Sequence, residues 1–366
     1  MDALSRHVAR RPLPAAVVAG GGGASRTAAL RSLARVGAPV VAVGYDAAHR
    51  LRSRSAFPVL APCPNAAPEE FVDLLLELAG VIGRPSPVFP LEGDALDVIA
   101  AARERLGERY RYPFPPWDDV SASRARRRQL EAARALGIPT PRSAEAPTDE
   151  LGFPVLVTPS DAAGFRRRFR APSFRCATRA ALDEAFTRAR DFDPIVEEVV
   201  PTRSLSSVGS YLADDGEALA VFCVRGFARP GRVVGRRHLE VTASEELVER
   251  ALALLRDLAL SGLAQVNFVR DERDGSEKLS TVELRLSRWH AVAAAAGIDL
   301  LRVSYWDLLG ARLSAAPARR ARRSSPIAFL RSSRAVLGAR PPSRRRERER
   351  TPSAPAAGRL VSGRRR

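Results

Sequence analysis

The sequence is poor in lysine, in cysteine and in long apolar runs, and each shortage narrows what the protein can be. Among 366 residues and 59 Lys+Arg, Lys278 is the only lysine. The three cysteines, Cys63, Cys176 and Cys223, are far apart, and none belongs to a Cys-x-x-Cys pair or a Cys/His cluster. This spacing argues against a zinc site and against a disulfide framework, and it favours buried apolar thiols.

No segment of eighteen or more apolar residues is present, so we expect no membrane-spanning helix. Residues 1–14 carry basic side chains without a long apolar run, which argues against a secretory leader. We therefore expect a cytoplasmic protein. The length exceeds that of one typical domain, and two or three compact units are expected.

The formal net charge of +18 is concentrated at one end of the chain. Residues 317–366 contain sixteen arginines and two acidic residues, a net of +14, which leaves +4 for residues 1–316. This arginine-rich tail can bury little apolar surface, so we expect it to be disordered. Its charge would permit salt-sensitive, non-specific binding of nucleic acid or an acidic partner, but few aromatics are available for base stacking. Biased codon usage is the alternative explanation.

The first hundred residues alternate between predicted strands and predicted helices. Apolar runs and turns predict strands at 15–23, 39–45 and 87–90, and helices at 24–36, 68–79 and 95–106. Such alternation is typical of an open parallel sheet with right-handed crossovers. A proline-rich segment at 112–119 is the first predicted boundary.

The second part of the chain is predicted to be richer in hairpins. Strands are predicted at 153–157, 193–201, 207–213, 217–225, 263–270 and 278–286, and helices at 122–136, 178–189, 244–260 and 289–310, the last with a break near Gly297. Turn residues at 214–216 and 273–275 indicate two hairpins. The predicted domains are therefore an α/β domain at 1–115, a second domain at 116–316 and the tail at 317–366.

The order of these elements resembles the ATP-grasp superfamily, in its branch of carbamoyl-phosphate-synthetase-like carboxylate ligases. Residues 262–310 carry the resemblance best, with a strand, an Asp-Gly hairpin, a strand ending in Glu-x-Arg, a Gly-Ile-Asp turn and a final Gly. FPVLVTP at 153–159 resembles the lid strand of the family, and IVEEVVP at 195–201 resembles its adenine-clamping segment. The resemblance runs from about 15 to 310.

The resemblance implies an α/β fold in which an open parallel pre-ATP-grasp domain precedes an ATP-grasp fold. The two α+β subdomains of that fold would clasp a nucleotide, with the lid at roughly 140–200. The implied activity is that of an ATP-dependent carboxylate–amine or carboxylate–thiol ligase that acts through an acyl phosphate. ATP and Mg²⁺ are the implied cofactors. A small-molecule carboxylate and an amine or thiol acceptor are the implied partners, and a homodimer is one possible assembly.

The metal-ligand positions of the family fall on Asn267 and Glu283. Magnesium prefers oxygen ligands, and alternate side chains of two neighbouring strands can present them from one face. Here Asn267 stands where the family has Glu, and Arg285 stands where it has Asn. A guanidinium beside Glu283 would compete with a metal by forming an ion pair. Two interpretations of Glu283 therefore stay open, a metal ligand or a partner of Arg285 or Arg288.

The phosphate-binding lysines of the family are also replaced. Arg124 and Thr158 stand at the two positions, and only Arg124 retains a positive charge. Arg126, Arg127 and Arg128 are alternatives to Arg124 for reaching a phosphate. Arg225, Arg229 and Arg288 are the candidate catalytic residues, because the resemblance places basic side chains near them toward the phosphates or the acyl group. For Arg124, Arg225 and Arg229 a solvated surface position is the alternative.

The adenine clamp is implied at Glu197, Glu198, Val199 and Val200. Backbone groups of residues 198–200 would bind the purine edge, and Glu197 or Glu198 would bind the ribose hydroxyls. A backbone clamp constrains the side chains little, so ATP or ADP could dock even where the phosphate geometry is unproductive.

Two further features suggest a binding role, and for each the sequence also offers a reason against it. The run Gly20–Gly23 suggests a dinucleotide loop with Asp46 as the ribose acid, but Ser25 stands where the pattern requires a third glycine. His290 falls near the implied substrate pocket, and packing or capping is its alternative role.

Three functions follow from these observations. The first is the ATP-dependent ligase. The second is a catalytically weakened homologue that binds a nucleotide or metabolite as a partner subunit, which the departures at the metal and lysine positions favour. The third is binding of nucleic acid or an acidic partner through the tail. The first two require strands 263–270 and 278–286 to form a hairpin with Asn267 and Glu283 on one face.

Overall fold

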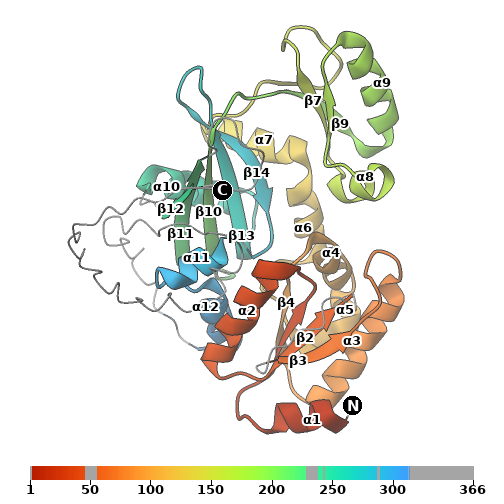
Figure 1. Cartoon of the computed structure of the whole chain (residues 1–366), viewed down its shortest axis with the longest axis vertical. Helices are drawn as coiled ribbons and strands as arrows, with labels where there is room; N and C mark the ends of the chain where they lie inside the picture. Colours follow the sequence, from red (N-terminus) through yellow and green to blue (C-terminus); the bar gives the residue numbers. More distant parts are fainter. Residues whose placement is uncertain are drawn as a thin grey trace, which may run out of the picture.

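The computed structural model describes residues 2–45, 56–227, 238–241, 244–286, 289–311 and 313, which contain three sheets (Figure 1). The first sheet is formed by β1 (Ala16–Ala19), β2 (Val40–Gly44), β3 (Ala56–Leu60), β4 (Ser86–Pro90) and β5 (Tyr110–Arg111). Its strands are parallel and follow the order β3-β2-β1-β4-β5. The helices of this part are α1 (Asp2–Ala9), α2 (Gly23–Val36), α3 (Pro68–Ile82), α4 (Gly93–Ala101) and α5 (Arg103–Leu106).

Both faces of the parallel sheet are buried, which explains why its strands are continuous apolar runs. Val17 of β1 belongs to a hydrophobic cluster that includes Leu75 of α3. Its neighbour Val18 points to the opposite face and belongs to a second cluster that includes Leu33 of α2. Glycine turns and helices then connect the strands, as the sequence predicts.

The second sheet is antiparallel and forms the centre of the molecule (Figure 1). Its strands are β10 (Ser204–Leu212), β11 (Ala218–Phe227), β12 (His238–Val241), β13 (Gly262–Arg270) and β14 (Glu277–Glu283), in the order β12-β11-β10-β13-β14. Helix α10 (Glu245–Asp257) packs on one face of the sheet, and α12 (Leu300–Leu308) packs on the other. The short helix α11 (His290–Ala295) lies against α2, so the two sheets share this helical layer.

The third sheet, with its two helices, projects from the rest of the molecule as a small lid (Figure 1). Its strands are β6 (Ser143–Ala144), β7 (Val155–Pro159), β8 (Phe174–Cys176) and β9 (Pro194–Glu198), in the order β6-β9-β7-β8. Helices α8 (Ala162–Phe169) and α9 (Arg179–Ala189) pack on it around a separate apolar core. Phe165 anchors that core, with ring centroids 4.7 Å from Phe169 and 4.8 Å from Phe174.

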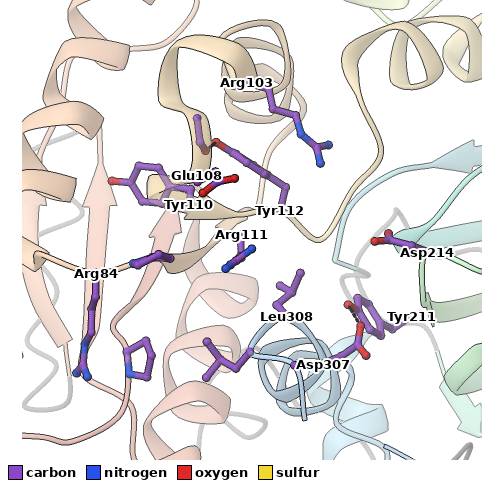
Figure 2. Close-up of a pocket in the computed structure, with 15 residues that line it drawn as sticks. Arg84, Arg103, Glu108, Tyr110, Arg111, Tyr112, Tyr211, Asp214, Asp307 and Leu308 are labelled. Carbon is purple, nitrogen blue, oxygen red and sulfur yellow. Dashed lines mark hydrogen bonds between the residues drawn. The ribbon is translucent and has the colours of Figure 1, made fainter. Parts of the chain in front are cut away.

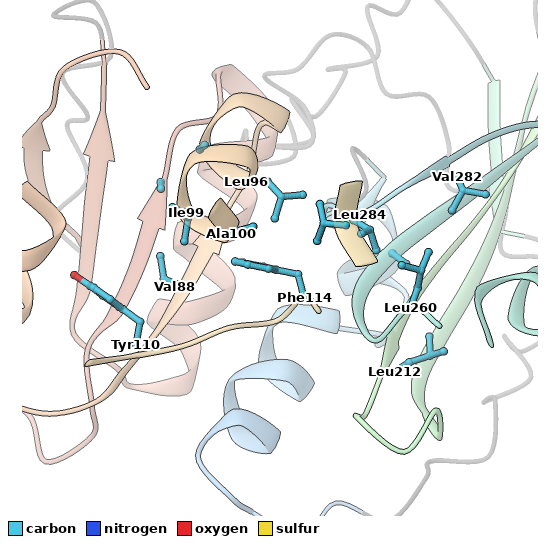
Figure 3. Packing of buried hydrophobic residues seen from close by; sticks show 14 of the residues in the cluster. Val88, Leu96, Ile99, Ala100, Tyr110, Phe114, Leu212, Leu260, Val282 and Leu284 are labelled. Carbon is cyan, nitrogen blue, oxygen red and sulfur yellow. The ribbon is translucent and has the colours of Figure 1, made fainter. Parts of the chain in front are cut away.

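A single hydrophobic cluster joins the parallel sheet to the central sheet (Figure 3). Val88 and Leu96 enter it from the N-terminal part, and Leu260 and Leu284 enter it from the central sheet. Phe114, in the connecting segment, is 4% exposed and lies between the two groups. The predicted division at 115/116 thus crosses a continuous core, which holds the two sheets in a defined relation.

The predicted helix at 122–136 is in fact two helices, α6 (Trp117–Arg124) and α7 (Arg126–Ala135). They separate at Ala125, whose ψ of 116° is extended rather than helical. The Gln129 side chain stabilises the break, because its Nε2 donates to the carbonyls of Ser123 and Val282. Helical periodicity does not report such a break, since both halves keep an apolar face. None of the described helices is long and apolar enough to cross a bilayer.

Candidate functional site at the lid and the β13–β14 hairpin

The β13–β14 hairpin has the register that the sequence predicts. Asn267 is the partner of Thr281, and Gln265 is the partner of Glu283. Partners across an antiparallel pair share a face, and so do residues two apart on a strand. Asn267 and Glu283 therefore lie on the same face of the central sheet, as predicted. The face assignment on which the nucleotide cleft depends is confirmed.

The Asn267 side chain is saturated with hydrogen bonds from its own sheet. Its Oδ1 accepts from Ser207 Oγ at 2.6 Å and from Gln265 Nε2 at 2.6 Å. Its Nδ2 donates to Thr281 Oγ1 at 2.8 Å. An amide oxygen has two lone pairs, and both are used here. Asn267 is therefore a structural link between three strands and a poor metal ligand.

Glu283 forms an ion pair with Arg285. Arg285 donates from Nε at 3.1 Å and from a terminal nitrogen at 2.7 Å, both to Oε2 of Glu283. Both side chains are 30% exposed, so the pair is partly accessible to solvent. Of the two interpretations left open by the sequence, the structure has the ion pair with Arg285.

The fit of Mg²⁺ to this set of residues is poor. The described residues contain no group of three or more His, Cys, Asp or Glu side chains that could hold a metal ion. One carboxylate is neutralised by a guanidinium, and the neighbouring amide oxygen is occupied. Magnesium needs several hard oxygen ligands in near-octahedral geometry. No step that passes through a metal ion can be derived from these residues.

Arg124 occupies the point where the N-terminal part, the lid and the hairpin meet. Burial is the main cause that lowers the pKa of Arg124 to about 10, and repulsion by Arg166 of α8 is the next. Asp94 and Glu283 raise its pKa, and Arg285 lowers it further. These electrostatic effects place charges from α4, α8 and β14 near one guanidinium. Arg124 remains protonated at neutral pH, because its pKa is still well above 7.

In the described structure the Arg124 guanidinium is paired with Asp97 of α4. Thr158, at the second lysine position, is half-buried on β7 beside Ile195 of β9. It points away from the lid core, because its neighbour Val157 is the one buried there. A hydroxyl can donate a hydrogen bond to a phosphate but cannot neutralise its charge.

Glu197 is held by Arg126 in a buried bidentate ion pair. A terminal nitrogen of Arg126 donates to Glu197 Oε1 at 2.7 Å and its Nε donates to Oε2 at 3.2 Å, and the two residues are 7% and 4% exposed. This pair connects the first turn of α7 to the lid strand β9. Bidentate geometry makes it one of the stronger polar contacts available to a protein. In this structure the Glu197 carboxylate is bound by Arg126.

Glu198 is surrounded by cations from the central sheet. Lys278 Nζ lies 3.1 Å from Glu198 Oε1, and a terminal nitrogen of Arg273 lies 2.8 Å from Oε2. Both cations also contact Asp271, at 2.8 and 2.6 Å. The backbone N–H of Arg142 donates to the same carboxylate at 3.0 Å. The sole lysine of the chain thus anchors the lid strand to the β13–β14 turn.

This network was missed at the level of sequence. Arg126 lies 71 residues from Glu197, and Lys278 lies 80 residues from Glu198. The only sequence signal was that Lys278 is a unique lysine beside the hairpin turn. The two glutamates were predicted to bind ribose, whereas in the structure both carboxylates are engaged by side chains of the chain itself.

The backbone of the predicted adenine clamp is free to bind. Val199 and Val200 follow directly after β9 and are half-buried. Among the backbone hydrogen bonds found outside helices and strands in the described ranges, none involves these two residues. Glu272, in the β13–β14 turn, donates its N–H to the next carbonyl, that of Pro201, at 2.9 Å. The segment is thereby held at its far end while two peptide units keep their polar groups available.

Arg225 does not lie on the face of the central sheet that carries Asn267 and Glu283. It is the partner of Ser206, whereas Asn267 is the partner of Ser207, so Arg225 and Asn267 point to opposite faces of the central sheet. Arg225 instead contacts Glu277 at 3.3 Å. The expectation that Arg225 faces the phosphates is therefore corrected by the register of β10 and β11. Arg229 and Arg288, the other two candidate catalytic residues, lie outside the described residues, and so does Asp46.

His290 has the structural surroundings of a packing residue. It opens α11, is 1% exposed, and its Nε2 lies 3.4 Å from Asp299 Oδ1. Burial lowers the pKa of His290, and Asp299 opposes that shift. Asp299 also caps α12 by accepting from the Arg302 N–H at 3.1 Å. Of the cysteines, Cys176 and Cys223 are buried as expected, but Cys63 is exposed.

A pocket of about 790 Å³ lies elsewhere, between β5 and α12 (Figure 2). Arg103 and Arg111 line it from the N-terminal part, and Asp214 and Asp307 line it from the central part. Tyr211 donates a hydrogen bond to Asp307 at 2.7 Å across its wall. None of the residues predicted to bind nucleotide or metal lines this pocket.

Comparison with known proteins places the fold. Biotin carboxylase from Campylobacter jejuni, solved with β,γ-ATP, matches with a TM-score of 0.61 and 12% identity over 87% of this chain and 74% of that one. N5-carboxyaminoimidazole ribonucleotide synthetase from Thermus thermophilus matches with a TM-score of 0.59 and 16% identity over 82% and 79%. L-amino acid ligase from Bacillus licheniformis matches with a TM-score of 0.58 and 19% identity over 81% and 74%.

These neighbours are ATP-grasp enzymes, and the chain has the ATP-grasp fold. The predicted fold class, a parallel α/β part followed by the two ATP-grasp subdomains, is confirmed. The likeness is one of structure, since no family profile matches the sequence and no curated protein resembles it.

Proposed function

We propose that the chain is a nucleotide-binding protein of the ATP-grasp type that binds ATP or ADP between the lid and the β13–β14 hairpin. The observation that carries the proposal is the convergence of three parts of the chain on one cleft. Asn267 and Glu283 lie on one face of the central sheet. Charged side chains of α4, α8 and β14 shift the pKa of Arg124. The fold neighbours support nucleotide binding, because several of them were solved with ATP or ADP.

The division of roles follows from the chemistry of the residues present. The free backbone groups of Val199 and Val200 would bind the adenine edge, and Arg124 would bind the phosphates. Thr158 would add a hydroxyl from the lid strand. For the ribose to reach Glu197 or Glu198, an existing ion pair must exchange. We therefore assign the ribose contacts to neither glutamate.

Whether the chain also catalyses a ligase reaction is a separate and more specific question than nucleotide binding. Carboxylate–amine ligation through an acyl phosphate is supported by the kind of enzyme that shares the fold, L-amino acid ligase among them. Two features oppose efficient phosphoryl transfer in this chain, the Arg285–Glu283 ion pair and the absence of a lysine at position 158. Phosphoryl transfer depends on positioned cations and metal, so these changes weaken it. We therefore propose a binding protein with weak ligase activity or none, which fits the role of a partner subunit.

Thermal unfolding with added nucleotide tests the proposal. ADP at a hundred times its dissociation constant should stabilise the folded chain by about 2.7 kcal/mol. Arg124→Ala should remove most of this stabilisation. The matched control is Arg105→Ala, which removes an exposed arginine paired with Glu69 and Asp73 far from the cleft. Absence of any shift with ADP and ATP, with or without Mg²⁺, would refute nucleotide binding.

A parallel assay addresses the reaction. Release of ADP and phosphate from ATP should stay at background when carboxylates and amines are supplied together with Mg²⁺. Turnover that needs both a carboxylate and an amine would show an active ligase and overturn the binding-only interpretation.

A further inference from the structure

We infer that the cleft binds its nucleotide without a metal ion, and that the Arg285 guanidinium supplies the charge that a divalent cation supplies elsewhere in this fold. The inference rests on the proposed function, because it specifies the chemical form of the nucleotide that the cleft accepts. It concerns free ADP or ATP, as opposed to their magnesium complexes.

The first support is the position of Arg285. It follows Glu283 by two residues, and its Nε and one terminal nitrogen are bound to Glu283 Oε2. A guanidinium carries five N–H donors in a planar fork, so donors remain after this contact. Glu283 thus orients the cation at the cleft surface, where the side chain is 30% exposed. Arginine held in this way is suited to binding phosphate oxygens.

The second support is that a metal ion would have to break existing contacts. To use Glu283, a cation must displace the Arg285 guanidinium from its carboxylate partner. To use Asn267, it must take the oxygen that already accepts from Ser207 and Gln265. Leaving buried polar groups without partners costs about 1–3 kcal/mol each. The site therefore lacks free oxygen ligands, and its existing contacts also oppose metal binding.

The third support is the gathering of arginines at one point. Arg124 of α6, Arg166 of α8 and Arg285 after β14 come close enough for the latter two to repel Arg124. Arg124 is paired with Asp97 and Arg285 with Glu283, so an anion that binds here must compete with these carboxylates. Free ADP and ATP carry more negative charge than their magnesium complexes and compete better, so this site should prefer the free forms.

The experiment is a titration of the full chain with ADP by calorimetry, once in EDTA and once with Mg²⁺ in large excess over ADP. We expect ADP to bind in EDTA, and to bind at least tenfold more weakly in excess Mg²⁺. Binding that requires Mg²⁺ would overturn the inference and keep the proposed function. Failure of ADP to bind under both conditions would overturn the proposed function itself, so the two failures are distinguishable.

Two substitutions at one position sharpen the test. Arg285→Asn removes the guanidinium and adds an amide oxygen beside Glu283, so ADP affinity in EDTA should fall about tenfold and Mg²⁺ should now improve binding. Arg285→Lys keeps the charge and should retain metal-free binding within a few fold. Arg270→Asn, on an exposed position of the same hairpin, is the control. Wild-type behaviour of Arg285→Asn in both buffers would contradict the role of Arg285.

Discussion

Glu198 is buried at the end of β9, and its carboxylate contacts cations from the opposite side of the cleft. Lys278 and Arg273 come from the β13–β14 hairpin and its turn, whereas Glu198 belongs to the lid sheet. Asp271, which is fully buried, completes the cluster by contacting both cations. A buried ion pair contributes less than its Coulomb energy because of desolvation, but the loss of one partner leaves an uncompensated charge. The cluster therefore makes the lid orientation depend on one glutamate.

Glu198→Gln should lower the free energy of unfolding by about 3 kcal/mol at pH 7, because it leaves the cations around Glu198 with only Asp271. Urea denaturation of the full chain measures this change. Glu145→Gln, which removes an exposed carboxylate paired with Arg127, is the matched control and should change stability by less than about 0.5 kcal/mol. Equal losses in the two variants would contradict the role assigned to the buried cluster.

The same difference should depend on pH. Burial alone would raise the pKa of Glu198, but hydrogen bonds from the Arg142 N–H, Arg273 and Lys278 outweigh it and lower the pKa to about 2. A lowered carboxyl pKa stabilises the fold above the ordinary value of 4.5, and this stability is lost as the pH falls toward 2. The gap between wild type and Glu198→Gln should therefore shrink to about half by pH 3. A gap that stays constant would contradict the ionic origin.

At the scale of elements, one glycine determines how the connecting segment meets the central sheet. Gly262 opens β13 with a φ of +80°, and a Cβ there would lie 2.1 Å from the Pro113 carbonyl oxygen. The next residue, Leu263, donates its N–H to that same oxygen at 2.8 Å. The carbonyl of Pro113 can approach the strand only because position 262 has no side chain. Phe114 is thereby placed in the cluster that joins the two sheets.

Gly262→Ala should lower the free energy of unfolding by about 3 kcal/mol or more, because backbone strain adds to the clash with Pro113. Gly297→Ala is the matched control, since Gly297 has a φ of +94° with no atom within 4 Å of the added Cβ. That control should cost about 1 kcal/mol from the backbone conformation alone. Chemical denaturation compares the two. Similar losses would show that the contact with Pro113 does not matter.

At the scale of the whole molecule, most of the net positive charge lies in residues 317–366, outside the described fold. Residues 317–366 have a net charge of +14 and lie outside the described residues, whereas residues 1–316 have a net charge of +4. The three sheets and the clusters that join them are built entirely before this tail. Binding through the tail and binding in the cleft are therefore separable by truncation.

Deletion of 317–366 should leave the midpoint of thermal unfolding unchanged within about 2 °C, because every residue of the described hydrophobic clusters precedes the tail. It should also abolish retention of the chain on duplex DNA at low salt, which the arginines would otherwise cause. Retention is measured against NaCl concentration for both chains. Retention that survives truncation would place the nucleic-acid affinity in residues 1–316.

Much of the architecture could be predicted because it depends on local pattern. Buried strands such as 39–45 are continuous apolar runs, and the turns at 214–216 and 273–275 mark the hairpins of the central sheet. The common face of Asn267 and Glu283 follows from counting in steps of two along paired strands. The strands β5, β6, β8 and β12 were not predicted, because their two to four residues carry too little periodicity, and the five-residue strand β3 was also missed.

The candidate site was predicted less well. Arg225 was assigned to the cleft, although a shift of one residue in register relative to Asn267 puts it on the other face. The ribose contact of Glu197 or Glu198 stays a prediction, and in the structure Arg126 and Lys278 hold the two carboxylates. Both cases depend on which side chains meet across long sequence separations.

The amino-acid sequence therefore determined the elements and their order, because hydrophobic periodicity and turn residues act over short stretches of chain. The ATP-grasp architecture was predicted from the resemblance of that order and its motifs to a known superfamily. Only the tertiary structure decided the chemistry of the cleft. There Arg126 holds Glu197, and the Glu198 cluster ties the lid to the central sheet. Such pairings depend on distances of a few ångströms between residues up to 80 positions apart, and local pattern carries no information about them.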